Sequence, residues 1–379
     1  MSFEKNVLKL SKLADRLLKG TLKVQYFDWY YSKFKYSSLI ITFIPFVTFM
    51  IGIFNHLVKH LRTHAFIYAD NAPDFSGLVS GVSAAYLTYA HYKQREEAKE
   101  LIKTFSDFRL VEKPNTFDIT NKKVSFGGVL FVSGYYLMAV FVYIGFASIS
   151  CPDGIEEGCG LLMPIYYPFL NLKKRGIRYA ILLMQVSGGF CMAIDTFLIT
   201  WIYNSQAELL CAFINHLKDM LMQIQQIPNP IDRRRQFREC VKYHHHLIDL
   251  AGQLMPLAGN TLVIHVVNSP IVMSMIAFQL KIEMSIIFGA HFFMWFYGTG
   301  ITCIFGQRLI NTSESLIVTV YLSIPWDGDY ELGRDMLLML LRSQRTFKMT
   351  GGSLISVDHI LFVTILKTAY SYMALFSGE

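Results

Sequence analysis

Long apolar stretches recur along the chain, and charged residues are concentrated in the connectors between them. A helix needs about 20 predominantly apolar residues to cross the hydrocarbon core of a bilayer. Seven stretches meet that length, and they cover residues 36–58, 70–90, 124–149, 177–203, 257–281, 284–306 and 352–376. The pattern therefore predicts an all-α membrane protein with seven transmembrane helices.

The connectors alternate in positive charge, and this alternation predicts how the chain is oriented. Lysine and arginine number 27 in the N-terminal segment and every second connector after it, against 7 in the other connectors, while Lys367 lies inside the last stretch. In membrane proteins the cytoplasmic loops carry the excess of these residues. With the N-terminus in the cytoplasm and seven crossings, the C-terminus is expected outside the cell.

The cytoplasmic connectors contain helical patterns of their own. Residues 203–226 continue the fourth stretch as a polar helix, and the Pro-Asn-Pro run at 228–230 interrupts it because proline lacks a backbone N–H. A second helix is expected over 231–256, ending near Pro256, and a third over 331–348. Their apolar stripes need a surface to pack against. Packing within one subunit and packing between subunits both remain open.

Composition narrows the class of protein further. Charged residues make up 17% of the chain and hydrophobic residues 53%, whereas an average soluble domain has about 25% charged residues. The net charge of +7 does not indicate nucleic-acid binding, because the basic residues lie beside apolar stretches rather than on one basic face. The sequence has no phosphate-binding glycine loop, zinc-protease helix or nucleophile elbow. We therefore expect neither an enzyme nor a cofactor.

Two groups of polar residues are candidates for a metal site or another functional site. His244, His245 and His246 are consecutive, so on a helix their rings point about 100° apart and cannot face one ion, which favours structural or solvated histidines over a metal site. Asp195 lies within the fourth stretch, where an ionisable group is costly and is a functional candidate by default. Pairing with a neighbouring helix would explain Asp195 equally simply.

Two cysteines flank a short connector that is expected to lie outside the cell. Cys151 and Cys159 are separated by seven residues. The extracellular side is oxidising, so disulfides form and persist there. A disulfide within this connector is therefore predicted, and free thiols are expected elsewhere.

Four segments near the C-terminus carry a family resemblance. They are Cys303-Ile-Phe-Gly-Gln307, Tyr321-Leu-Ser-Ile-Pro-Trp326, Leu338-Met-Leu-Leu-Arg-Ser-Gln-Arg345 and Leu366-Lys-Thr-Ala-Tyr-Ser-Tyr372. Together they resemble the insect odorant receptor family. The related gustatory receptors usually end with a threonine-tyrosine pair followed by a glutamine-phenylalanine pair, a pattern from which Ala369-Tyr-Ser-Tyr-Met-Ala-Leu-Phe376 departs. The rest of the chain resembles the family in length, in the spacing of its stretches and in its inverted orientation.

The resemblance implies a tetrameric, ligand-gated, non-selective cation channel in the plasma membrane of olfactory sensory neurons. In such channels the last helix lines the pore and cytoplasmic helices anchor the subunits. The resemblance accordingly divides the chain into residues 1–306 with six helices and an odorant pocket, an anchor region at 307–350, and a pore helix with a short tail at 351–379. The family's co-receptor carries a long extra segment between its fourth and fifth helices, for which 205–257 leaves no room. An odorant-tuning subunit that assembles with the co-receptor is thus implied.

By position, the outer halves of the second, third, fourth and sixth stretches supply the pocket that the resemblance implies. These positions are mostly apolar or aromatic, as suits a small hydrophobic volatile. They are Ser76, Val79, Tyr136, Val140, Tyr143, Met184, Ser187, Gly188, Cys191, Ser285, Phe288, Gly289 and Phe292. Ordinary interhelical packing would account for any one of them. The adjacent Gly188 and Gly189 indicate that something approaches closely, either a ligand or a neighbouring helix.

One face of the last stretch is a candidate pore lining. Thr364, Thr368, Ser371 and Leu375 recur at spacings of four, three and four, which places them on one side of a helix. Hydroxyl groups can replace part of an ion's water shell, and an apolar ring can close a pore by dewetting. Leu375 near the outer end is therefore the candidate gate. Small residues that let lipid-embedded helices pack closely are the alternative explanation.

Three other classes of membrane protein are alternatives to an odorant receptor channel. A G-protein-coupled receptor also has seven helices, but it has the opposite orientation and an acidic-Arg-aromatic triplet after its third helix, which this chain lacks. A gustatory-type receptor channel remains open as an alternative, because it is related to the odorant receptors. A secondary transporter would show repeated halves and paired broken helices, which the sequence does not have.

Overall fold

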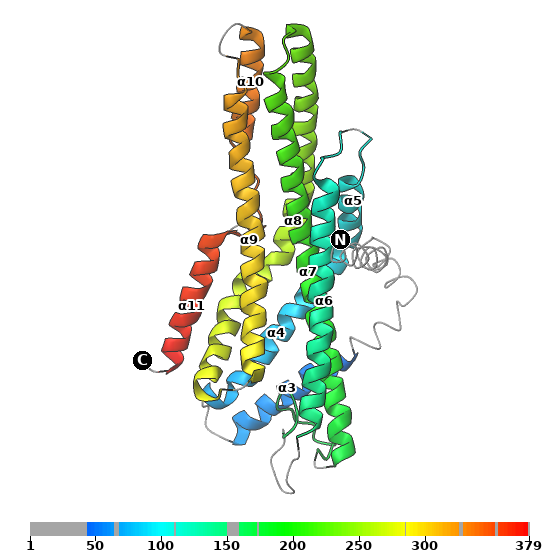
Figure 1. The fold of residues 1–379 in the computed structure, drawn as a ribbon. Coiled ribbons are helices and arrows are strands. Elements are labelled where there is room, and N and C mark those ends of the chain that lie inside the picture. Colours follow the sequence, from blue (N-terminus) through cyan, green and yellow to red (C-terminus); the bar gives the residue numbers. More distant parts are fainter. Residues whose placement is uncertain are drawn as a thin grey trace, which may run out of the picture.

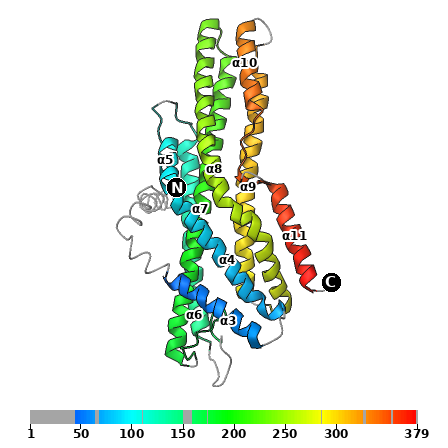
Figure 2. The same cartoon turned by 180° about the vertical axis from the view of Figure 1, so that it is seen from behind.

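The computed structural model describes residues 44–63, 68–109, 111–149, 159–172, 174–284, 286–325, 329–352 and 355–377. In these ranges the regular secondary structure is helical apart from one two-stranded hairpin (Figures 1 and 2). The elements are α3 (Ile44–Thr63), α4 (Tyr68–Lys93), α5 (Arg95–Phe105), α6 (Phe117–Ala147), α7 (Arg175–Ile224), α8 (Pro230–Ile282), α9 (Ile286–Leu322), α10 (Tyr330–Ser343), β1 (Thr350–Gly351), β2 (Ile355–Ser356) and α11 (His359–Ser377).

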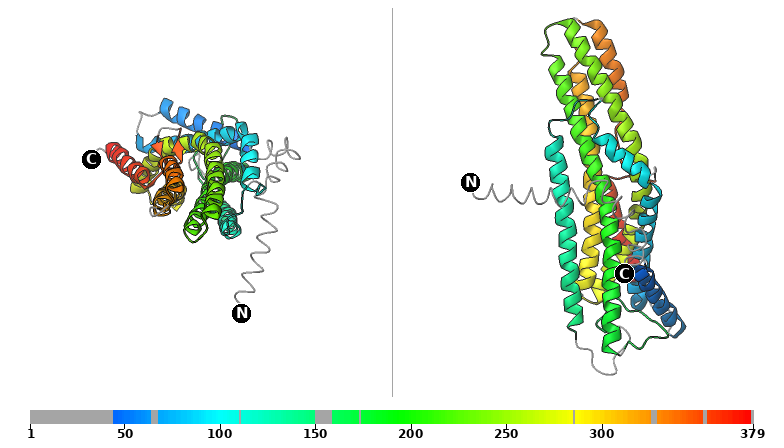
Figure 3. Two further views of the ribbon diagram at one scale, coloured as in Figure 1. Left: turned by 90° about the horizontal axis from the view of Figure 1, so that it is seen from above. Right: turned by 90° about the vertical axis from the view of Figure 1, so that its right-hand side faces the viewer.

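Three long helices, α7, α8 and α9, run the length of the molecule and pack against one another. The ends of these helices, together with α10, extend well beyond α3 and α11 (Figures 1 and 3). With 50 residues, α7 is about 75 Å long at 1.5 Å per residue, more than twice the roughly 30 Å hydrocarbon core. The predicted extension of the fourth stretch into a polar helix over 203–226 is confirmed.

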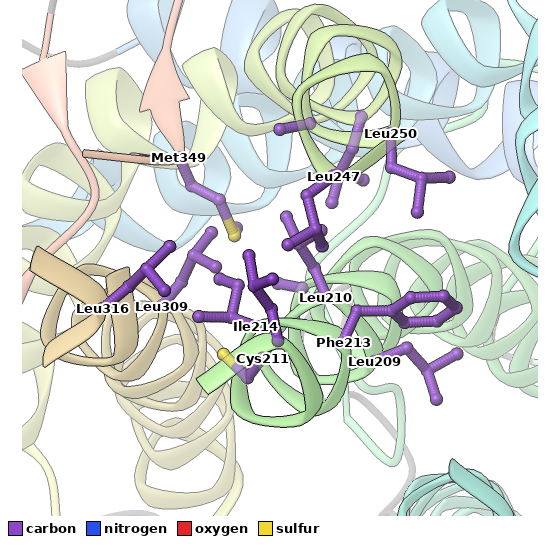
Figure 4. Packing of buried hydrophobic residues seen from close by; sticks show 14 of the residues in the cluster. Leu209, Leu210, Cys211, Phe213, Ile214, Leu247, Leu250, Leu309, Leu316 and Met349 are labelled. Atoms are coloured by element: carbon purple, nitrogen blue, oxygen red, sulfur yellow. The ribbon is translucent and has the colours of Figure 1, made fainter. Parts of the chain in front are cut away.

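The extended ends form a close-packed apolar core of their own. Leu210 and Ile214 of α7, Leu247 and Leu250 of α8 and Leu309 of α9 are fully buried in it (Figure 4). At the far tip the Arg234 guanidinium binds the carboxylates of Asp329, at 2.9 Å, and Glu331, at 2.6 Å. The extensions therefore pack on each other within one subunit, which was one of the two alternatives. A role between subunits stays a prediction.

The break between α7 and α8 follows the sequence, but the expected end at Pro256 is wrong. Asn229 caps α8 by accepting a hydrogen bond from the Ile231 N–H, at 3.1 Å. The helix then continues unbroken through Pro256 and Pro270 to Ile282. Each proline removes one hydrogen bond from the ladder. Burial of apolar side chains on both sides of these prolines, at Leu254, Leu257, Ala258, Val272 and Met273, offsets that loss.

Three other boundaries also differ from the prediction. Helix α9 continues past residue 306 to Leu322, so the anchor region does not begin at a break in the chain. Helix α10 ends at Ser343, five residues before the predicted 348. The last helix begins at His359 rather than at 352, because the β1–β2 hairpin occupies the intervening residues.

Hydropathy and length together mark three helices in the described part of the chain as able to cross a membrane, namely α3, α8 and α9, and α11 as a shorter apolar helix. Helices α4, α6 and α7, with 26, 31 and 50 residues, are also long enough to cross a membrane. Two polar residues near the start of α4, Asn71 and Asp74, are buried against the protein. This inward placement reconciles a weakly apolar sequence with a transmembrane position.

Candidate ligand site and pore-facing helix

The last helix, α11, packs on α8 and α9 through one side only. Leu361, Ile365 and Ala369 are buried against its own subunit. The predicted pore residues lie away from that side: Thr364 and Ser371 are exposed, Thr368 is half-buried, and Leu375 is 72% exposed. Within one subunit this face is therefore left uncovered.

The hydroxyl groups on this face are already oriented by their own helix. Thr364, Thr368 and Ser371 each donate to the carbonyl four residues earlier, at 2.8, 2.8 and 3.0 Å. Because the proton of each hydroxyl is used inside the helix, the lone pairs of its oxygen point outward. Such a row of acceptors is suited to contact with cations.

The larger side chains on the other sides of α11 pack to different degrees. Ile365 is buried, and the Phe362 ring meets the Phe296 ring edge-on at 5.3 Å between centroids. Tyr372 is 40% exposed within a single subunit. The side chain of Phe376 lies outside the described residues.

The connector between α10 and α11 packs against two glycines, Gly259 of α8 and Gly306 of α9, which together form a glycine seat for its backbone. The backbone N–H of Gly352 donates to the carbonyl of Gly259 in α8, at 3.0 Å, and Gly352 adopts a left-handed φ of 60°. On α9, Gly306 lies directly against the carbonyl of Val357. A side chain at either Gly259 or Gly306 would meet connector backbone. The start of α11 is therefore fixed to both α8 and α9.

The predicted ligand residues that the structure describes fall into two packed regions. Tyr143 and Met184 pack against a cluster formed by α3, α7 and residues 159–172, whereas Phe292 packs against the main core and stacks on Phe296. Ser76 and Ser187 donate to backbone carbonyls of their own helices. Val79, Phe288 and Gly289 are half-buried or partly exposed, and Val140 is 55% exposed on the surface of α6. The side chains of Tyr136, Cys191 and Ser285 lie outside the described residues.

Gly188 marks a close approach between helices. A Cβ added there would lie 2.8 Å from the backbone nitrogen of Phe46 and from the carbonyl carbon of Pro45 in α3. Helix packing therefore accounts for Gly188, as the alternative explanation had it. At Gly189 an added Cβ would only touch the Phe49 ring at 3.7 Å.

A recess that the sequence did not reveal lies between α7 and α9. Its walls are Phe197, Thr200, Trp201, Asn204, Tyr297, Gly298 and Ile301, and its empty volume is about 240 Å³, including the part open to the surroundings. The one sequence signal was a pair of polar residues, Thr200 and Asn204, one turn apart in an otherwise apolar stretch.

The remaining candidates have separate outcomes. Cys159 is disulfide-bonded and Cys211, Cys240 and Cys303 are free, but Cys151 lies outside the described residues, so the pairing stays a prediction. The side chain of Asp195 also lies outside them.

The three histidines occupy different environments on α8. His244 is buried, His245 is exposed and His246 is half-buried. Burial, together with the charges of Arg342 and His245, lowers the pKa of His244 to about 4. His244 is therefore a neutral ring that packs on the core at neutral pH.

Truncating Tyr143 or Phe288 to alanine is expected to reduce sensitivity to the odorant. Removing a large apolar ring from a binding surface costs ~1 to 3 kcal/mol, which corresponds to a rise of roughly fivefold to 150-fold in the half-maximal odorant concentration. Concentration–response curves measure it, and Phe141→Ala, which removes an aromatic ring at a 72% exposed position on α6, is the control. Wild-type sensitivity of both mutants to every active ligand would place the pocket elsewhere.

Comparison with known proteins gives a consistent family match. A family model described as "7tm Odorant receptor" matches residues 73–370. The odorant receptor coreceptor of Anopheles gambiae is 26% identical over 156 residues, which are 38% of this chain and 33% of the coreceptor. Odorant receptor 85c of Drosophila melanogaster is 20% identical over 148 residues, which are 38% of each chain. The chain thus aligns with little more than a third of the length of these relatives.

Solved structures of similar fold extend the match over the whole molecule. The insect olfactory receptor OR5 from Machilis hrabei has a TM-score of 0.62 at 9% identity, and the match covers 88% of this chain and 87% of that receptor. The same receptor in complex with eugenol gives a TM-score of 0.62 and covers 90% of this chain. At this identity the likeness establishes the fold alone.

Proposed function

Because the chain belongs to the odorant receptor family, whose model matches most of its length, we propose that it is the odorant-binding subunit of a ligand-gated cation channel opened by a small hydrophobic volatile. The observation that carries the proposal is the uncovered face of α11. In the part of the subunit that the structure describes, Thr364, Ser371 and Leu375 are exposed and Thr368 is half-buried, which suits a helix that faces a shared pore.

A tuning subunit is favoured over the co-receptor by the turn between α7 and α8. Only residues 225–229 separate the two helices. The co-receptor of the family carries a long extra segment at this point, and five residues leave no room for one. We therefore propose that the chain assembles with the co-receptor in a heterotetramer in the plasma membrane of olfactory sensory neurons.

Expression of the chain alone is expected to give no odorant-evoked current, whereas co-expression with the co-receptor is expected to give a cation current. The measurement is whole-cell recording against a panel of volatiles, with surface labelling to show that the chain is present in both cases. Co-receptor expressed alone provides the background. Robust current from the chain by itself would contradict its assignment as a tuning subunit.

A G-protein-coupled receptor is the second candidate function, and orientation separates the two. An epitope added after Glu379 is expected to be accessible to antibody on intact cells, since α11 ends outside in the channel reading. Staining only after permeabilisation would favour the receptor reading instead.

A further inference from the structure

The recess between α7 and α9 combines apolar walls with one buried hydrogen-bond acceptor. Phe197, Trp201, Tyr297 and Ile301 form a rim that is half-buried or partly exposed. Asn204 lies at its base and is 1% exposed. The Trp201 indole is fixed, because its Nε1–H donates to the carbonyl of Val124 in α6 at 3.1 Å.

The orientation of the Asn204 amide follows from its neighbours. The hydroxyl of Thr302 donates to the carbonyl of Gly298 at 2.9 Å, so its oxygen can only accept from Asn204. The Asn204 Nδ2 is therefore the atom that faces Thr302, at 3.1 Å. The Oδ1 atom is then turned away and buried, and it has no hydrogen-bond partner among the residues that the structure describes. A buried acceptor left in this state is costly.

We propose that this recess is a second binding site, for a small amphiphile with an apolar body and one hydrogen-bond donor, of which an alcohol is the simplest example. The donor satisfies the Asn204 Oδ1, and the apolar body lies among the aromatic rim residues. The empty space of about 240 Å³ includes the part open to the surroundings, so the recess encloses only the hydroxyl end of the ligand, and the apolar body lies along the rim. The site is separate from the predicted odorant residues, none of which lines it.

The position of the recess gives a bound molecule a route to the pore-facing helix. Tyr297, Gly298 and Ile301 face the recess from one turn of α9. From the same turn, Phe296 and Gly300 contact Phe362 of α11. A ligand that spreads α7 from α9 therefore acts on the contact between α9 and α11.

The test uses two photoreactive probes on membranes from cells that express the chain together with the co-receptor. One probe is a medium-chain 1-alkanol that carries a diazirine, and the other is its methyl ether, which lacks the donor. Mass spectrometry locates the labelled peptides. The alkanol is expected to label residues 197–204 or 297–301 more than the ether does, by about threefold to tenfold, the range that one net hydrogen bond contributes.

Asn204→Leu is expected to bring the ratio of alkanol to ether labelling close to one. The ratio corrects for any general loosening of the recess, and Thr302→Ser is the matched control because it keeps the hydroxyl that accepts from Nδ2 and therefore the orientation of the Oδ1 acceptor. Ile301→Trp is expected to block both probes by filling the recess. An unchanged ratio in Asn204→Leu, or labelling that avoids both segments, would overturn the proposal.

Discussion

Replacing Gly306 with alanine is expected to abolish odorant-evoked current from the assembled channel. The added Cβ would overlap the carbonyl oxygen of Val357 and lie 3.0 Å from its carbonyl carbon. Both are backbone atoms, so relief requires movement of the connector that leads into α11 rather than rotation of a side chain. Overpacking of this kind costs ~1 to 3 kcal/mol and displaces backbone. Whole-cell recording with surface labelling measures the loss.

The control for this substitution is Gly252→Ala in α8, where an added Cβ meets nothing within 4 Å. Alanine is the better helix former by up to ~1 kcal/mol, so this variant should retain both its current and its surface level. If Gly306→Ala behaves like Gly252→Ala, the connector is free to move and the glycine seat does not fix α11.

Local signals in the sequence were sufficient to predict the break between α7 and α8 and the need of the extensions for packing partners. The Pro-Asn-Pro run ends α7 and starts α8, because Asn229 caps the new helix and proline fits its first turn. The apolar stripes of the extensions likewise predicted that these helices need partners, and Figure 4 shows the core that they form. Both signals, the interruption and the apolar stripes, are patterns among residues close together in the sequence.

The errors arise where distant parts of the chain override a local rule. Pro256 lies in α8 between buried residues, so packing across the bundle keeps the helix continuous. The late start of α11 had a local signal that was missed: the Asp358 carboxylate accepts from the Leu361 N–H at 2.9 Å, as a capping residue does. The apolar residues before it were counted as helix, but they belong to the hairpin.

The binding sites could be placed only at the level of helices. Val140 and Tyr143 are three residues apart on α6, yet one is 55% exposed and the other packs against a buried cluster. Which residue faces inward depends on the rotation of the helix about its axis, and the neighbouring helices set that rotation. A nearly uniform apolar stretch has no pattern from which the rotation can be predicted. The recess at Asn204 and Gly298 joins segments far apart in the sequence, so only the fold reveals it.

Replacing Leu375 with serine is expected to raise the resting current or alter ion preference while leaving the ranking of ligands unchanged. The 19 residues of α11 span about 28 Å at 1.5 Å per residue, close to the roughly 30 Å hydrocarbon core. This is shorter than a helix starting at 351 would be, and it still places Leu375 near the outer end.

Leu375 is 72% exposed, and the hydroxyl row of Thr364, Thr368 and Ser371 leads along α11 toward it. An apolar ring at this level can close a pore by excluding water, and a hydroxyl in its place would admit water. In a mixed tetramer the co-receptor contributes the remaining positions of the ring, so the change is smaller than in a channel made of one subunit type.

Leu137→Ser, at a 62% exposed position on α6, controls for loss of an exposed leucine. A Leu375→Ser channel with normal resting current and permeability but a reordered ligand ranking would move this residue from the gate to the pocket.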